Sequence, residues 1–159
     1  MKTKIILASS SPRRKELAKQ MGLEFEVKPS NYEEDMTQDM PPEELAKTLA
    51  LGKAKDVADK TEKGIVIGVD TFIAFQEKII GKPKDAEDAK KTLNAFSGKI
   101  VKIYSGMALI DARSGKKILD CEVTEVKFAD MNEKEIERYV ATGEPLDKAG
   151  SHGIQGLAA

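Results

Sequence analysis

Apolar residues gather in short runs that alternate with longer amphipathic stretches along the chain. The runs at 4–8 and 25–27 predict short buried strands, and the continuous run 64–69 predicts a central strand that ends on Asp70. Residues 30–40 are acidic and rich in turn formers, which predicts a loop. Apolar residues at helical spacing predict helices over 12–21, 43–60, 85–96 and 132–139. Alternating patterns predict hairpins over 72–80 and 100–128, the second turning at 113–115.

The first predicted helix has clear sequence boundaries. Ser11 suits the N-cap, Pro12 suits the first helical position and Gly22 suits the C-terminal stop. The apolar stripe of this helix would consist of Leu17, Ala18 and Met21. Because hairpins and crossover helices both occur, the expected class is α/β with a mixed sheet. The sequence has no repeat, linker or composition step, so we expect one domain over residues 1–159.

The charge balance limits the possible partners. The chain has 26 Lys and Arg against 27 Asp and Glu, and its net charge of -1 gives no overall field that would attract nucleic acid or an acidic membrane. The first apolar run is too short for a signal peptide or a membrane span, so we predict a cytoplasmic protein. The single Cys121 cannot form an internal disulfide.

The first loop has the residues of an anion site. Hydroxyls at Ser9–Ser11 precede a helix N-terminus, and Arg13 and Arg14 lie on its first turn. Free N–H groups and the helix dipole favour phosphate there, and a guanidinium can bind two phosphate oxygens. An ordinary capped helix with arginines facing solvent is an equally good interpretation of this stretch alone.

Several carboxylates and lysines later in the chain are further candidate site residues, although their local sequence is less distinctive. Asp70, at the end of an apolar strand, can activate water or bind a metal, although such a residue is often only a turn former. Glu33, Glu34 and Asp35 offer oxygen ligands to a cation, or form a solvated acidic loop. Lys53 in the long helix and Lys82 between Gly81 and Pro83 are weak signals on their own.

The C-terminal stretch 143–156 crowds glycines with polar residues, which suits close approach of the backbone to a ligand. The Gln155 amide could pair with the edge of a base. His152 is the only histidine and is expected in an exposed loop, so a zinc site is disfavoured. Walker A, dinucleotide-binding and nucleophile-elbow patterns are absent, which leaves metal-assisted attack by water as the simplest hydrolytic chemistry.

Four motifs together resemble the Maf proteins, a family of nucleotide pyrophosphatases also known as septum formation inhibitors. In chain order they are Ser9-Ser10-Ser11-Pro12-Arg13-Arg14, Gly68-Val69-Asp70-Thr71, Gly81-Lys82-Pro83, and Glu144-Pro145-Leu146-Asp147-Lys148-Ala149-Gly150 with Gly153-Ile154-Gln155-Gly156. The resemblance implies an α/β fold like that of inosine triphosphate pyrophosphatases, with an elongated mixed sheet flanked by helices and a cleft between two lobes. It also implies a divalent cation, Mg²⁺ or Mn²⁺, and a homodimer as a plausible state.

The resemblance also implies roles for individual residues. Asp70 would accept the proton from the attacking water. Base choice would depend on Arg13, Thr71 and Gln155, which together resemble the branch acting on dTTP and UTP. Phosphate-binding residues would be Ser9, Arg14, Lys53, Lys82 and Lys148, and residues at or behind the metal would be Glu33, Glu144 and Asp147. The family usually continues into a further strand pair, whereas this sequence stops at Leu157-Ala158-Ala159, so we expect that segment to be lacking.

A second function stays open at this stage. A nucleotide-binding regulator of cell division would need the arginine loop and Gln155 but not Asp70. A nucleic-acid-binding module is disfavoured, because the charge is balanced and few aromatic residues are interleaved with basic ones.

Overall fold

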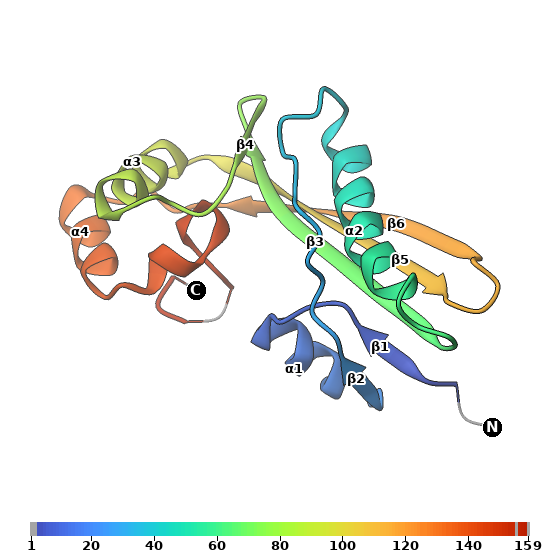
Figure 1. Ribbon diagram of the computed structural model, residues 1–159. Coiled ribbons are helices and arrows are strands. Elements are labelled where there is room, and N and C mark those ends of the chain that lie inside the picture. The colour runs from blue at the N-terminus through green and yellow to red at the C-terminus, as the bar shows by residue number, and fades with distance from the viewer. Residues whose placement is uncertain (1–2, 155, 159) are drawn as a thin grey trace. The chain divides into compact units, whose positions relative to one another are not determined.

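The computed structural model describes residues 3–154 and 156–158. Figure 1 shows the elements, which in chain order are β1 (Ile5–Leu7), α1 (Pro12–Gln20), β2 (Phe25–Val27), α2 (Pro42–Ala58), β3 (Ile65–Phe75), β4 (Lys78–Ile80), α3 (Ala86–Phe96), β5 (Ile100–Asp111), β6 (Lys117–Lys127), α4 (Glu133–Ala141) and two short 3-10 helices, Glu144–Asp147 and Ala149–Ser151. Among the described residues, no helix is both long enough and apolar enough to cross a membrane.

The strands form a six-stranded mixed sheet in the order β2-β1-β3-β5-β6, with β4 paired to β3. β1 runs parallel to both β2 and β3, and α1 and α2 are the crossover helices that parallel pairing requires. β3 and β4 are antiparallel. β5 and β6 also form a hairpin, in which Asp111 donates to Lys116 at one end and Phe128 donates to Lys99 at the other. The α/β class with a mixed sheet is therefore confirmed.

The chain divides into two compact units, the first made of Met1–Asp70 with Ser105–Glu122. Its core contains Ile6, Val66 and Ile110 from the sheet and Ala50, Ala54 and Val57 from α2. α2 lies very close to the strands, since a Cβ added at Gly68 would fall 2.3 Å from the Ala50 carbonyl oxygen. A Cβ added at Gly106 would fall 2.1 Å from the Ala46 carbonyl oxygen. Only glycine at these two strand positions allows the helix to pack at this distance.

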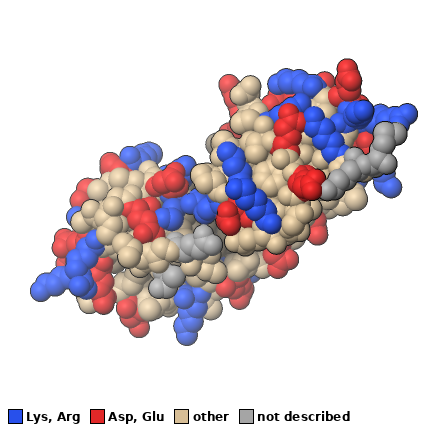
Figure 2. Space-filling view, turned by 90° about the horizontal axis from the view of Figure 1, so that it is seen from below, with Lys and Arg blue, Asp and Glu red and all other residues tan. Residues whose placement is uncertain are grey.

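The second unit consists of Thr71–Tyr104 and Val123–Ala159. α3 and α4 pack together through Ala89, Leu93, Ile136 and Val140. Asn132 caps α4 in a reciprocal capping box with Glu135, which confirms the predicted start of that helix. Acidic and basic side chains are interspersed on the face shown in Figure 2, in keeping with the net charge of -1.

Two predictions about local structure were wrong. β3 does not end on Asp70 but continues to Phe75, and its residues 73–75 pair with β4. α1 buries none of its residues, and Leu17 and Met21 are 56% and 73% exposed, so the predicted apolar stripe does not enter a core. The predicted N-cap is confirmed, since Ser11 occupies that position, although its side chain makes no capping hydrogen bond.

Candidate active site

Asp70 is a buried acid in the middle of β3. Its residue is 3% exposed, while the next residue, Thr71, faces solvent, as strand alternation requires. One carboxylate oxygen, Oδ1, forms an ion pair with Nζ of Lys53. The other, Oδ2, is buried and has no hydrogen-bond partner among the residues described. Because buried polar atoms are normally hydrogen-bonded, this oxygen is available to accept a hydrogen bond from water or to bind a cation.

Lys53 places one ammonium between two carboxylates. It comes from α2, and its Nζ lies 2.7 Å from Oε1 of Glu34 in addition to its contact with Asp70. The Lys53 side chain is 12% exposed and that of Glu34 is 44% exposed, so the group extends from the interior to solvent. The close packing of α2 at Gly68 brings the lysine within reach of the strand.

The first loop contributes a hydroxyl and a guanidinium. Ser9 is 6% exposed, and its Oγ accepts hydrogen bonds from Nη1 of Arg14 at 3.3 Å and from the backbone N–H of Ser11 at 3.2 Å. Burial lowers the pKa of Arg14, and the carboxylates of Asp70 and Glu34 oppose that shift. An arginine stays protonated under such conditions, so a partly desolvated positive charge lies near the two acids.

The carboxylates near Asp70 are too few to enclose a metal ion by themselves, but they could bind Mg²⁺ together with water and substrate phosphates. No cluster of three or more His, Cys, Asp or Glu side chains able to hold a metal occurs in the described part of the chain. Mg²⁺ usually binds one or two carboxylates and completes its shell with water and substrate phosphates. The half-exposed carboxylate of Glu34 fits that requirement.

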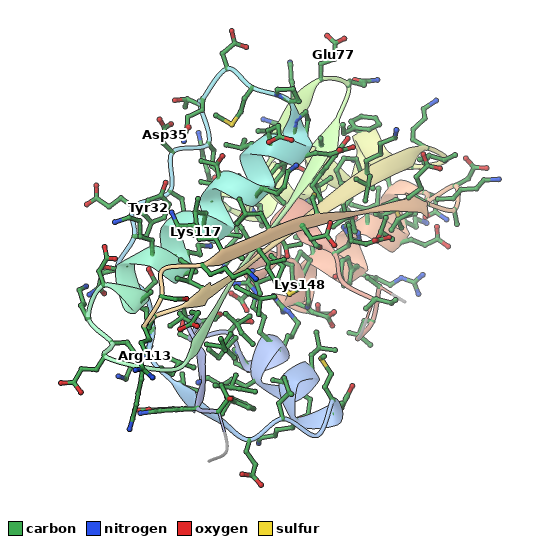
Figure 3. The ribbon with its side chains drawn as sticks, turned by 90° about the vertical axis from the view of Figure 1, so that its right-hand side faces the viewer. Tyr32, Asp35, Glu77, Arg113, Lys117 and Lys148 are labelled. Atoms are coloured by element: carbon green, nitrogen blue, oxygen red, sulfur yellow. The ribbon has the colours of Figure 1, made fainter. Side chains whose placement is uncertain are left out.

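A second polar group lies in the other compact unit, around Glu144. Its carboxylate lies 2.9 Å from Nζ of Lys148, which is labelled in Figure 3, and accepts the N–H of Leu157 at 3.1 Å. The Lys148 ammonium and the Leu157 N–H lower the pKa of Glu144. Burial, and after it the Glu144 carboxylate, raise the pKa of Tyr139 to about 12. A Cβ at Gly156 would fall 2.3 Å from Oε1 of Glu144, so the chain passes close to this carboxylate.

The other candidate site residues from the sequence that the structure describes lie at the surface. Lys82 and Asp147 form an exposed ion pair at 3.0 Å. Arg13, Glu33 and Thr71 are exposed, and Gln155 lies outside the described residues.

His152 does not lie in an exposed loop as predicted. Its ring packs edge-on against Phe128, 4.7 Å away between centroids, and burial lowers its pKa. The prediction failed because the apolar partner of this histidine, Phe128, is remote in the sequence.

Glu34 was named in the sequence only together with Glu33 and Asp35, and Glu33 was the one assigned to the metal. In the structure the carboxylate of Glu34 meets Lys53. The two adjacent acids lie in a segment without helix or strand, where no periodicity indicates which side chain points inward. The only signal was the presence of the acidic run itself.

Comparisons with known proteins agree with the motifs. The family model for Maf-like proteins matches residues 4–159. A dTTP/UTP pyrophosphatase of Alkaliphilus oremlandii is 49% identical over 155 residues, covering 97% of this chain and 80% of that protein. A dTTP/UTP pyrophosphatase of Desulforamulus reducens is 46% identical over 154 residues, covering 97% and 81%. Among solved structures, protein VC0702 from Vibrio cholerae is 14% identical with a TM-score of 0.43, covering 91% of this chain and 69% of that chain, a likeness too weak to support an argument. The chain belongs to the Maf family.

Proposed function

We propose that this protein hydrolyses dTTP and UTP to the nucleoside monophosphate and pyrophosphate. The observation that carries the proposal is the buried Asp70, whose Oδ2 is unpaired beside Lys53 and Glu34, in a chain of the Maf family. A carboxylate in that position can accept a proton, and the neighbouring cationic groups suit a triphosphate.

In the proposed reaction, Oδ2 of Asp70 takes a proton from a water molecule as the water oxygen attacks the α-phosphorus. The bond to the bridging oxygen breaks, and pyrophosphate leaves as one piece. Arg14 and Lys53 neutralise charge on the phosphates, and Ser9 orients the guanidinium of Arg14 through its hydrogen bond. As the phosphates approach, the Lys53 ammonium can exchange one of its two carboxylate partners for a phosphate oxygen, while Oδ2 of Asp70, which Lys53 does not contact, accepts the proton.

A divalent cation, Mg²⁺ or Mn²⁺, would be held by Glu34 together with the substrate phosphates, with Glu33 as a further candidate ligand. When bound, such a cation supplies charge neutralisation at the phosphate oxygens. For Lys82 and Lys148 we propose phosphate binding. Asp147 and Glu144 would then act indirectly, because each of them pairs with one of these lysines.

Base choice is assigned to Arg13, Thr71 and Gln155 on the strength of the resemblance. An amide offers both a donor and an acceptor, which matches the edge shared by uracil and thymine. Replacing Gln155 with Glu removes the donor, so the preference for UTP and dTTP over other triphosphates should weaken. Equal relative rates across a nucleotide panel for this variant and the wild type would contradict the assignment.

The test incubates the purified chain with each nucleoside triphosphate and Mg²⁺ or Mn²⁺, and quantifies pyrophosphate, orthophosphate and monophosphate separately. We expect pyrophosphate with UMP or dTMP. Asp70→Asn should bind nucleotide and lose turnover. Wild type that binds nucleotide without releasing any product would favour the rival function, a regulator of cell division that acts without hydrolysis.

Two further proposals concern the oligomeric state of the protein and its location in the cell. A homodimer is proposed from the family resemblance, and light scattering of the purified chain tests it. A cytoplasmic location is proposed from the sequence, and fractionation of cells that express the chain tests it.

A further inference from the structure

The acidic loop, residues 30–40 between β2 and α2, is bonded to α2 through Asp56. Oδ2 of Asp56 accepts the backbone N–H of Asn31 at 2.8 Å and the hydroxyl of Ser30 at 3.1 Å. Oδ1 of the same carboxylate pairs with Nζ of Lys60 at 2.5 Å. Ser30 Oγ in turn accepts the N–H of Tyr32 at 3.0 Å. One aspartate therefore fixes three consecutive residues of the loop on the helix.

The ring of Tyr32 makes a second contact with the helix, one residue before Lys53. A Cβ added at Gly52 would lie between 2.3 and 2.6 Å from three ring atoms of Tyr32, so the ring rests directly on the helix backbone. Figure 3 labels Tyr32 on the loop that runs beside α2. Glycine is a poor residue for a helix interior, and here its lack of a side chain makes room for the ring.

These contacts lie next to Lys53 on the helix surface. Gly52 and Asp56 are four residues apart and so lie on one face of α2, and Lys53, three residues before Asp56, is a neighbour of Asp56 on the helix surface. Two residues after Tyr32, Glu34 meets the Lys53 ammonium at 2.7 Å. An ion pair with a half-exposed partner is too weak to fix a loop on its own, so the position of Glu34 depends on the bonds that precede it.

We propose that Asp56 and Tyr32 are positioning residues, which hold the acidic loop on α2 and thereby place Glu34 beside Lys53 at the reacting centre. The catalytic part of this inference rests on the proposed function, whereas the attachment of the loop does not. Neither residue touches the substrate, and both act through Glu34.

The attachment is tested by amide hydrogen exchange at Asn31 and Tyr32, measured by NMR. Asp56→Ala removes the acceptor, and we expect exchange at both amides to become at least about tenfold faster, since exchange rate follows the opening equilibrium of the loop. Asp56→Asn keeps one acceptor oxygen and should give an intermediate rate. Asp59→Ala is the matched control, because Asp59 pairs with Lys55 on the same helix, and it should leave both rates unchanged.

Gly52→Ala is a second variant, which tests the same attachment with Asp56 in place. It remains informative even if Asp56→Ala fails to fold. Alanine favours the helix more than glycine does, so α2 itself is not weakened, yet the new methyl group must displace the Tyr32 ring. We expect faster exchange at Tyr32 without a lower melting temperature. Unchanged exchange in both Asp56→Ala and Gly52→Ala would overturn the proposal.

The catalytic link is tested by a double-mutant cycle with UTP and Mg²⁺. Asp56→Ala and Gly52→Ala should each lower kcat/KM by about tenfold in the wild-type background and have no further effect in a Glu34→Gln background, because they act through Glu34. Equal effects in both backgrounds would overturn the link to Glu34. If the wild type released no pyrophosphate, the proposed function would fail, while the exchange rates would still decide whether Asp56 and Tyr32 hold the loop.

Discussion

Replacing Lys53 with Met would remove the cationic partner of the buried Asp70 while keeping an unbranched stem in α2. The Lys53 side chain is 12% exposed and the Asp70 side chain is 4% exposed, so the carboxylate would stay buried without its ammonium. Breaking a buried ion pair by removing one partner costs about 3–5 kcal/mol. We expect the lower end, about 3 kcal/mol, because the nearby charge of Arg14 would still act on Asp70.

The assay is urea unfolding at neutral pH followed by circular dichroism, together with calorimetry. At about 2–4 °C per kcal/mol for a chain of this size, the melting temperature should fall by about 6–12 °C. The double variant Lys53→Met/Asp70→Asn should regain most of the loss, since the buried charge is gone as well. Lys55→Met, at an exposed ion pair on the same helix, should be nearly neutral.

Two results would refute the reasoning. A Lys53→Met variant as stable as the wild type would mean that Asp70 does not depend on this ammonium. A double variant no more stable than Lys53→Met alone would mean that the loss arose from packing of the stem, and the charge argument would be wrong.

Gly68→Ala would place a Cβ 2.3 Å from the Ala50 carbonyl oxygen, and we expect a loss of about 1–3 kcal/mol by urea unfolding; an unchanged midpoint would contradict the close packing. The Lys60 ammonium and the Asn31 N–H lower the pKa of Asp56 from 3.8 to about 2. Its contribution to stability is therefore complete above its unfolded pKa and is lost as the pH falls through its folded pKa, so the advantage of wild type over Asp56→Asn should vanish in that window of an acid-unfolding series. Chelation of divalent cations should stop turnover and added Mg²⁺ should restore it; full activity in excess chelator would argue against a metal.

Much of the fold is predictable because burial follows local sequence pattern. The predicted hairpin over 100–128 corresponds to β5 and β6, and the start of α4 follows from Asn132 and Glu135. Both signals lie within a few residues of the element that they define. The strand pairing that extends β3 through Asp70 to Phe75 depends on β4, and the pattern of β3 alone did not reveal it.

The candidate site was predictable as a set of residue types and less so as a set of contacts. Lys53 looked like one lysine among several on a charged helix, and only the packing of α2 at Gly68 shows why it meets Asp70. That Glu34 meets Lys53 follows from the path of an irregular loop, which is bonded to Asp56, a residue remote in the sequence. The helix α1 shows that an apolar stripe in the sequence does not guarantee burial, because none of its residues is buried in a core.

The alternation of β3 limits how this protein can change during evolution. Asp70 points inward and Thr71 outward because successive side chains of a strand face opposite ways. Single substitutions at outward positions leave that order intact. A one-residue insertion or deletion between Gly68 and Asp70 would turn the acid toward solvent and bring a different side chain against α2. We therefore expect the lineage to vary the side chains of this strand while keeping its length constant.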